Sequence, residues 1–130
     1  MGKYVFRHED GICGELHDGA GTFNVLINRE TAGAANFALL YNVCKPGVVT
    51  EPHEHEVEHA LYIVRGKGTL TIGKESYSVS EDTAIFVPPK TPHSLYTRAN
   101  EPLEYLVLYS PPGPDRQLIA DGAAAFRKPK

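Results

Sequence analysis

The 130-residue chain lacks several features that would point to particular classes of function. It has no apolar run near the ~18 residues that a membrane helix needs. Its formal charge is −3 at pH 7, and its one basic group, at residues 127–130, is too short to indicate a nucleic-acid partner. The first ten residues have no apolar signal core, and Phe6 stands where a myristoylation signal has Ser or Thr. We therefore expect a cytoplasmic protein with neither a membrane nor a nucleic acid as partner.

Cysteine is scarce, and the usual nucleotide motifs are absent. Cys13 and Cys44 do not form a CxxC pair, so we expect two reduced, partly buried thiols. There is no internal repeat and no Rossmann fingerprint. The glycines at 66 and 68 do not have the GxxxxGK[ST] spacing of a phosphate loop, and they lie between two expected strands, where a tight turn needs glycine.

The chain does contain a succession of short β-rich runs separated by Gly and Pro turns. A chain of this length is most simply one domain with one core. Runs this short favour a β-sandwich or barrel over an α/β domain. Only residues 115–127 look helical, as a turn or two broken at Gly122, and residues 1–20 have weak periodicity. The expected strands are 22–27, 36–44, 59–64, 69–72, 76–79, 83–87, 94–97 and 103–109.

Four histidines are the main chemical feature. His53, His55 and His59 lie in one run, Pro-His-Glu-His-Glu-Val-Glu-His, and His93 lies far downstream. On an extended chain the three odd-numbered side chains point to the same face. Burying them together without partners is costly, and a late first-row metal ion removes that cost. A histidine-rich surface strand and a pH sensor built on paired histidines remain as alternatives on spacing alone.

Two motifs around these histidines resemble those of the cupin family. Gly47-x5-His53-x-His55-x3-His59-x6-Gly66 resembles the first cupin motif, and Asp82-x5-Pro88-x-Lys90-x2-His93-x3-Thr97 resembles the second. The resemblance covers about residues 37–110 and implies a small single-domain, all-β cupin at 1–130. Such a fold is an RmlC-like jelly roll, a double-stranded β-helix barrel. Residues 1–21 would then be an N-terminal arm and residues 111–130 a short C-terminal tail.

Three positions depart from the family motifs. His59 stands in place of the glutamate of the first motif, Lys90 in place of the glycine of the second, and Thr97 in place of its final asparagine. Spacing and strand parity favour His59 over Glu58, which only a bulge would turn inward. The chain therefore resembles small bacterial cupins that bind manganese or another divalent ion through four histidines. A four-histidine zinc cupin is also known among aromatic polyketide cyclases.

The resemblance implies a metal site formed by His53, His55, His59 and His93, with His8 and His17 left as isolated, non-ligand histidines. Four neutral imidazoles on a divalent ion leave a net charge of about +2 rather than the +1 of a site with one glutamate. Such a centre attracts an anionic chelating substrate, and an octahedral ion keeps two open positions. We expect one divalent transition metal, manganese first, with iron, zinc, nickel and copper as alternatives. Because the ligands must be neutral, the ion should be released below roughly pH 6.

The other residues predict a pocket but no catalytic side chain. Leu61, Ile63 and Leu95 share the parity of the neighbouring histidines and should line an apolar interior that suits a small organic ligand. Cys44 is a candidate pocket thiol. Glutamates 54, 56 and 58 should face solvent or orient the imidazoles. The strand tyrosines, at 41, 62, 96, 105 and 109, are expected in the core.

The pattern and the resemblance together predict a metal-dependent enzyme acting on a small oxygen-bearing organic substrate. A dioxygenase-like oxidoreductase comes first, because two open positions could hold substrate and dioxygen together. A redox-neutral isomerase, cyclase or lyase with the metal as Lewis acid comes second. A non-enzymatic small-molecule-binding cupin is the third reading, since the fold does not decide among them. The resemblance also implies a homodimer.

Overall fold

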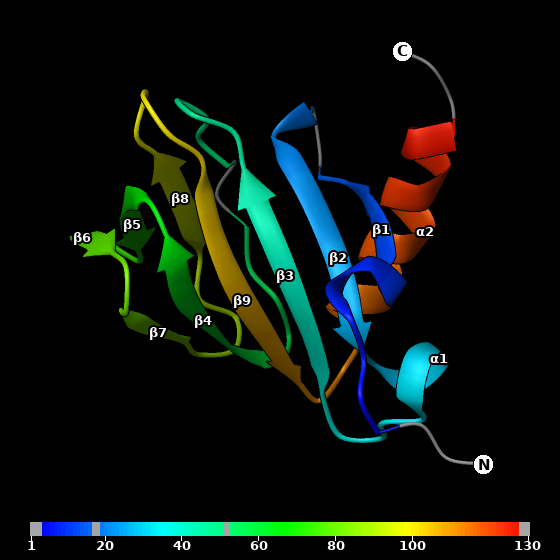
Figure 1. Ribbon diagram of the computed structural model, residues 1–130. Helices are drawn as coiled ribbons and strands as arrows, with labels where there is room; N and C mark the ends of the chain where they lie inside the picture. Colours follow the sequence, from blue (N-terminus) through cyan, green and yellow to red (C-terminus); the bar gives the residue numbers. More distant parts are fainter. Residues whose placement is uncertain (1–3, 17–18, 51–52, 128–130) are drawn as a thin grey trace.

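Two antiparallel sheets make up the fold, in a computed structural model that describes residues 4–16, 19–50 and 53–127 (Figure 1). The strand order is β1-β2-β3-β9-β4-β7 in the larger sheet and β6-β5-β8 in the smaller one. The strands of the larger sheet are β1 (Ile12–Glu15), β2 (Gly21–Ile27), β3 (Ala38–Cys44), β4 (Glu58–Arg65), β7 (Ala84–Val87) and β9 (Leu103–Ser110). Those of the smaller sheet are β5 (Lys67–Ile72), β6 (Glu75–Ser80) and β8 (His93–Thr97).

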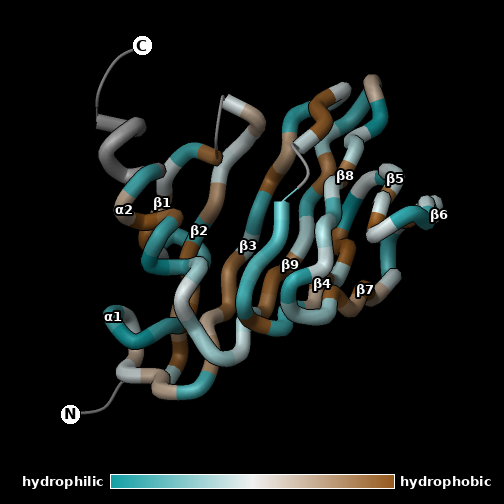
Figure 2. The backbone as a smooth tube through the Cα atoms, turned by 180° about the vertical axis from the view of Figure 1, so that it is seen from behind, coloured by the Kyte–Doolittle hydropathy of each residue, from teal (hydrophilic) through white to brown (hydrophobic). Residues whose placement is uncertain are grey.

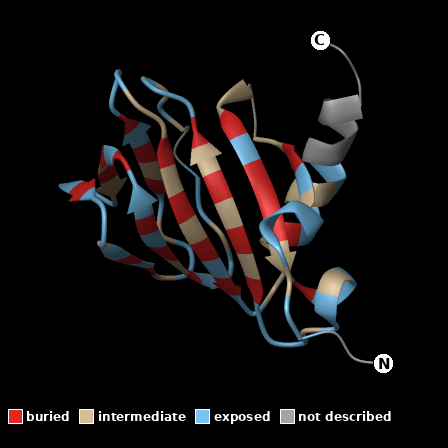
Figure 3. Cartoon of the chain, in the orientation of Figure 1, coloured by how far each residue is buried: buried red, intermediate tan, exposed pale blue. Residues whose placement is uncertain are grey.

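Side-chain burial alternates along these segments, as expected of strands with one face toward the core. Along β3 and β9 every second side chain is buried, which Figure 3 shows as bands across the ribbons. The two strands pair along their whole length, from Ala38 opposite Tyr109 to Cys44 opposite Leu103. Hydropathy does not alternate as strictly, because Asn42 is buried and Leu108 is 38% exposed, and hydrophobic stretches run along the strands (Figure 2). A period of two places one set of side chains in the space between the sheets and the other set outside.

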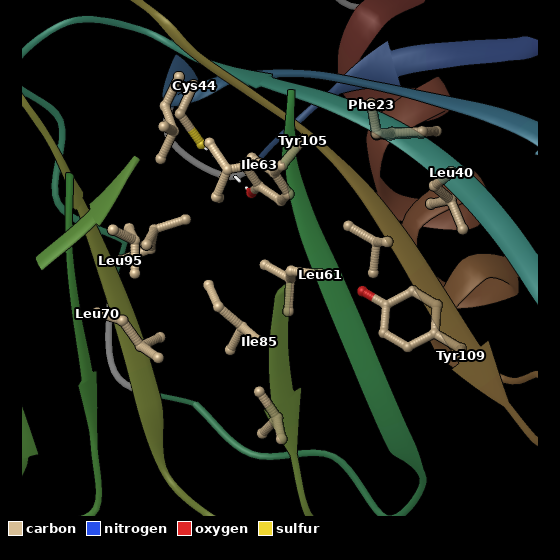
Figure 4. Packing of buried hydrophobic residues seen from close by; sticks show 14 of the residues in the cluster. Phe23, Leu40, Cys44, Leu61, Ile63, Leu70, Ile85, Leu95, Tyr105 and Tyr109 are labelled. Atoms are coloured by element: carbon tan, nitrogen blue, oxygen red, sulfur yellow. Dashed lines mark hydrogen bonds between the residues drawn. The ribbon is translucent and has the colours of Figure 1, made fainter. Parts of the chain in front are cut away.

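The buried set forms one apolar core inside the barrel (Figure 4). Ile63 and Leu103 are completely buried there, and Leu61 and Leu95 are nearly so. The prediction that Leu61, Ile63 and Leu95 face an apolar interior is therefore confirmed. Gly66 joins β4 to β5 with φ at +98°, and an added Cβ would lie 2.4 Å from the carbonyl oxygen of Pro102. That turn needs glycine, as its place between two expected strands indicated.

The eight expected strands are all present, with ends shifted by one or two residues. Three elements were missed: β1, the 3-10 turn η1 (His8–Asp10) and the short helix α1 (Arg29–Ala32). The predicted break at Gly122 is wrong, because α2 (Pro114–Arg127) continues through it. One helical glycine costs only about 1 kcal/mol relative to alanine, and three alanines that favour helix follow it.

Helix α2 packs beside β1, next to the open edge of the larger sheet (Figure 1). Its start is held by the buried Asp115, whose carboxylate accepts hydrogen bonds from the Gly113 N–H at 2.9 Å and the Asn28 amide at 3.0 Å. Asn28 also begins α1, where its side chain and that of Thr31 form a capping box. Among the described residues, no helix has the length and apolar character needed to cross a bilayer.

Candidate metal centre

Backbone pairing brings the first and last of the four histidines together. His93 begins β8 and forms an isolated antiparallel bridge with His53. The two residues exchange both backbone hydrogen bonds, at 3.0 and 2.9 Å. His59 is the second residue of β4 and lies opposite Val87 of β7 and Tyr109 of β9. His55 lies outside the strands, and its carbonyl oxygen accepts a hydrogen bond from the Lys90 N–H at 2.7 Å.

The expectation of one extended strand carrying three histidines is wrong in its local geometry. The chain bends at Glu56 and Val57, so only His59 belongs to a strand. Strand parity therefore does not bring the side chains together. They converge because His53 is paired to a distant strand and the bend at Glu56 and Val57 leads directly into β4, which begins at Glu58.

The four imidazoles nevertheless lie in one cluster. Their ring centroids are 4.3 Å apart for His53 and His93, 4.8 Å for His59 and His93, and 5.1 Å for His55 and His59. His53 and His55 are 5.0 Å apart. One potential ligand nitrogen from each of His53, His55 and His93 lies within 4.8 Å of the others. His59 adds a fourth ring to that group.

The acidic residues of the same run face outward. Glu54, Glu56 and Glu58 are all exposed, and Glu56 makes a salt bridge with Lys90 at 3.7 Å. His59 and His93, in contrast, are 6% and 7% exposed. Glu58 is therefore not turned inward by a bulge, and these three glutamates face solvent rather than the imidazoles.

Burial keeps the inner imidazoles neutral. Loss of solvent lowers the pKa of His59 to about 3 and that of His55 to about 4, and the charges of the neighbouring histidines act in the same direction. Burial also lowers the pKa of His93, against a hydrogen bond to Thr91 that raises it. The His93 Nδ1–H donates to the Thr91 carbonyl at 2.9 Å, which leaves the lone pair on Nε2 available to a metal.

The donor set fits a divalent transition-metal ion. Two nitrogens on opposite sides of such an ion are about 4.2 Å apart, twice a metal–nitrogen bond of about 2.1 Å. The separations of up to 4.8 Å among the nitrogens of His53, His55 and His93 need only a small contraction, and the His59 ring centroid lies 4.8 Å from that of His93. The Nδ1 atom of His59 is buried and has no hydrogen-bond partner among the described residues. A buried nitrogen without a partner costs free energy, and a bond from this ring to an ion would offset part of that cost. Neutral imidazoles suit zinc, copper, iron and nickel as well as manganese.

The cluster opens into a cavity of about 860 Å³ inside the barrel. Tyr109 lies next to the histidines, with its ring centroid 5.6 Å from that of His55 and 5.2 Å from that of His59. Burial, followed by the charge of Asp115, raises the pKa of Tyr109, so its hydroxyl stays protonated. Gln117 and Asp121 of α2 line the cavity. Its wall is otherwise mainly apolar, with Leu16, Val48, Val49, Leu61, Leu70, Leu95, Val107 and Leu118.

Expectations for the remaining polar residues hold only in part. Tyr105 and Tyr109 are buried, but Tyr62 and Tyr96 are 43% and 37% exposed. Tyr41 is half-buried at the outer face of β3, where its hydroxyl donates to Glu104 at 2.6 Å. The prediction fails for the two exposed tyrosines because each follows an inward-facing leucine. Leu61 of β4 and Leu95 of β8 face the core, so Tyr62 and Tyr96 point to the opposite face of the sheet.

The two cysteines are free, as expected, but they differ in burial. Cys44 is 1% exposed and lies 3.4 Å from the Tyr105 hydroxyl, whereas Cys13 is exposed, contrary to the expectation of partial burial. Exposed His8 packs edge-on against Tyr41, away from the cluster. His17, the other histidine expected to stand alone, lies outside the described residues.

Sequence reasoning did not place Asn42, Tyr109 or the residues of α2 in the cavity, where the structure has them. Parity along residues 103–109 places Tyr109 with Val107 and Tyr105, and parity along β3 places Asn42 with Leu40 and Cys44. That signal was available for the strands. For α2 no local pattern showed which part of the barrel it would cover.

A family model for the Cupin domain matches residues 42–109. An uncharacterized protein of Methanocaldococcus jannaschii is 37% identical over 67 residues, which are 51% of this chain and 54% of that protein. Mannose-1-phosphate guanylyltransferase RfbM of Salmonella typhimurium is 30% identical over 92 residues, 69% of this chain and 18% of the enzyme. The chain therefore spans about half of the first relative and under a fifth of the second.

Solved structures match over most of the chain. The polyketide cyclase RemF from Streptomyces resistomycificus superposes with a TM-score of 0.74 at 27% identity, covering 86% of this chain and 81% of the cyclase. An RmlC-like cupin from Shewanella frigidimarina gives 0.72 at 16% identity, covering 88% and 96%. A variant of the oxalate decarboxylase of Bacillus subtilis gives 0.73 at 23% identity, covering 85% of this chain and 30% of the enzyme. The latter two likenesses concern the fold alone.

Proposed function

This chain belongs to the cupin domain family, and from that premise we propose that it is a divalent-metal-dependent enzyme acting on a small oxygen-bearing organic substrate. Its fold is the all-β cupin jelly roll that the sequence motifs implied. The observation that carries the proposal is the convergence of four imidazoles at one end of a mainly apolar cavity.

The proposed ligands are His53, His55, His59 and His93, and the proposed ion is manganese first, with iron, zinc, nickel or copper as alternatives. When bound there, the ion would supply a Lewis acid for an oxygen of the substrate. The burial of His55 and His59 favours the neutral form that a ligand needs. No carboxylate of residues 53–59 faces the cluster, so four neutral ligands would leave a charge of about +2 at the ion. The carboxylate that lines the cavity is the exposed Asp121, which accepts a hydrogen bond from Gln117. The ion would therefore favour an anionic oxygen of the substrate.

The protein itself would orient the substrate and exclude water. Leu61, Leu95 and Val107 form an apolar wall beside the histidines, which lowers the local dielectric and strengthens polar contacts at the site. The Tyr109 hydroxyl, kept protonated by burial, points into the barrel toward Leu61 (Figure 4). It can donate a hydrogen bond to a substrate oxygen beside His59.

Among the reactions considered, we place redox-neutral chemistry (isomerase, cyclase or lyase) ahead of a dioxygenase. A ligand set without carboxylate stabilises high metal oxidation states less, and Glu58 faces away from the cluster. The likeness to a polyketide cyclase at 27% identity supports the same choice. A dioxygenase-like reaction and a non-enzymatic binding role are the outcomes that the tests below would reveal instead.

Metal analysis is the first test. Protein expressed with added manganese, iron or zinc should contain about one equivalent of ion, and well under one equivalent would refute the site. His59→Glu should keep the ion and alter its electron paramagnetic resonance spectrum. Glu58→Gln is the matched control, because Glu58 is exposed and one residue away, and it should leave the spectrum unchanged.

Activity is the second test. The metal-loaded protein would be incubated with a panel of β-diketones and 2-hydroxy acids while oxygen consumption and products are followed. Product formation without oxygen uptake supports the redox-neutral reaction, and oxygen uptake would indicate a dioxygenase. Thermal stabilisation by panel compounds with no turnover would indicate a binding protein. The homodimer that the family resemblance implies and the cytoplasmic location expected from the sequence are part of the proposal, and light scattering of the metal-loaded chain checks the dimeric state.

A further inference from the structure

We infer that the barrel interior has a second ligand-binding end, formed by Asn42 and supported by Tyr105, that recognises a hydroxyl group of the substrate. The inference rests on the proposed function, because it places the other end of the substrate at the four histidines. It adds the chemical class of the ligand: an elongated, largely apolar molecule with acidic or chelating oxygens at one end and a hydrogen-bond donor at the other.

The inward-facing side chains form successive levels along the barrel strands. On β9, Tyr109 lies opposite His59, and Tyr105 lies four residues away, opposite Asn42 of β3. Four residues of an antiparallel strand span about 13 Å. Figure 4 shows Tyr105 beside Cys44 and Tyr109 in a different part of the barrel. The level between them is apolar and consists of Leu61, Leu70, Leu95 and Val107.

One continuous cavity connects the two ends. The four histidines, the apolar level, Asn42 and Tyr105 all line the same space of about 860 Å³. A ligand as small as acetate would reach one end only. A molecule that contacts both ends must have an apolar body that fits against the leucines.

Asn42 carries an unused hydrogen-bond acceptor at the far end. Its side chain is 4% exposed, and its Oδ1 atom has no hydrogen-bond partner among the described residues. A buried polar atom left in this state costs about 1–3 kcal/mol. Natural proteins seldom keep such an atom without a function or a bound partner, and Asn42 also borders the cavity.

Neighbouring groups hold the Asn42 amide but do not satisfy this atom. Asn42 is a hydrogen-bond partner of the Tyr105 hydroxyl. That hydroxyl also lies 3.4 Å from the sulfur of the buried Cys44, the contact drawn as a dashed line in Figure 4. Tyr105 therefore already has partners on the protein and acts as a positioning residue. The carbonyl oxygen of Asn42 remains to accept a hydrogen bond from a ligand.

The chemistry of this end selects a neutral donor. Asn42, Cys44 and Tyr105 carry no formal charge in their neutral forms, and burial raises the pKa of both Cys44 and Tyr105. An ammonium group would lose its hydration here without gaining a counter-charge. A hydroxyl group can donate to the Asn42 oxygen at little cost, so the ligand is a hydroxylated one.

The test compares three naphthoates on the manganese-loaded protein by calorimetry: 2-naphthoate, 6-hydroxy-2-naphthoate and 6-methoxy-2-naphthoate. All three carry the same carboxylate for the histidine end, and only the hydroxy acid carries a donor at the far end. We expect it to bind about fivefold more tightly than 2-naphthoate, the value of one net hydrogen bond. The methoxy acid should show no gain.

Asn42→Leu should remove the fivefold preference while leaving the affinity for 2-naphthoate and the metal content unchanged. Asn24→Leu is the matched control, because Asn24 is also a buried asparagine with an unpartnered Oδ1 but lies on β2 and does not line the cavity. It should keep the preference.

Several results would overturn the inference. Equal binding of the hydroxy and plain acids by the unmutated protein would refute a donor-specific end, as would equally tight binding of the methoxy acid. These results need no variant and hold even if Asn42→Leu fails to fold. A preference that survives in Asn42→Leu would exclude Asn42. Failure of all three acids to bind the metal-loaded protein would instead remove the proposed function on which the inference rests.

Discussion

Acid should destabilise the metal-free protein chiefly through its buried histidines, and His59 is the clearest case. Its side chain is 6% exposed, and burial, followed by repulsion from His93, His55 and His53, lowers its pKa from 6.5 to about 3. Between these two values the unfolded chain binds a proton at this ring and the folded chain does not. The free energy of unfolding must therefore fall as the pH falls from about 6.5 toward 3, and it levels off below that range.

The size of the effect follows from the same two pKa values. One such histidine removes up to about 1.4 kcal/mol of stability per pH unit, and about 2 kcal/mol between pH 7 and pH 5. This is a large fraction of the 5–15 kcal/mol by which small domains are stable. His55 acts in the same direction, since its pKa is lowered to about 4, but its greater exposure reduces its share because solvent screens the charges.

Urea unfolding in the presence of EDTA, followed by circular dichroism at pH 7 and pH 5, measures this loss. His59→Gln removes the titrating group, so the loss between the two pH values should shrink by about 2 kcal/mol. His8→Gln is the matched control, because His8 is an exposed histidine outside the cluster, and it should lose as much as the unmutated chain. If His59→Gln also loses as much, His59 is not held neutral in the folded protein and the reasoning is wrong.

Three further predictions concern the metal, the thiols and the core. Because burial lowers the pKa of His55 to about 4, half of the bound ion should be released below pH 6 rather than at it, as equilibrium dialysis would show; half-release above pH 6 would contradict this. A disulfide-exchange reagent should modify exposed Cys13 quickly and buried Cys44, whose pKa is raised by burial, only on unfolding; Cys13→Ser should abolish the fast phase. Ile63→Ala, at a fully buried site, should cost about 2–5 kcal/mol in urea unfolding. Val64→Ala, next to it and 38% exposed, should cost under about 1 kcal/mol.

The strands could be predicted from the sequence because their signal is local. β3 and β9 are runs rich in apolar and aromatic residues between turn signals, and the period of two then separates inward from outward positions. Tyr105 and Tyr109 could be placed inside by the same reasoning, and Tyr62 outside. The glycine at the end of β4 marked a turn whose backbone only glycine adopts easily.

The geometry of the histidine cluster could not be predicted in this way, because it depends on pairing between distant segments. The bridge between His53 and His93 joins residues forty positions apart, and the bend at Glu56 and Val57 lies between that bridge and β4. The position of α2 likewise depends on the contact of Asn28 with Asp115. The motif spacing correctly indicated which histidines lie together. The assumption that three of them share one extended strand was wrong.

The effect of having His59 in place of glutamate on the charge of the site depends on the surrounding residues. The neighbouring glutamates face solvent, where Glu56 pairs with Lys90, so they do not restore the lost negative charge to the cluster. An ion held by four neutral rings therefore draws its charge balance from the ligand, which favours a substrate with an acidic or enolic oxygen at this end. At the far end the side-chain oxygen of Asn42 has no partner among the described residues. It can accept a hydrogen bond, which favours a hydroxyl group of the ligand there. Each end alone would bind many metabolites, and a molecule that presents both groups on an apolar body of the required length would bind more tightly than one that presents the acidic group alone.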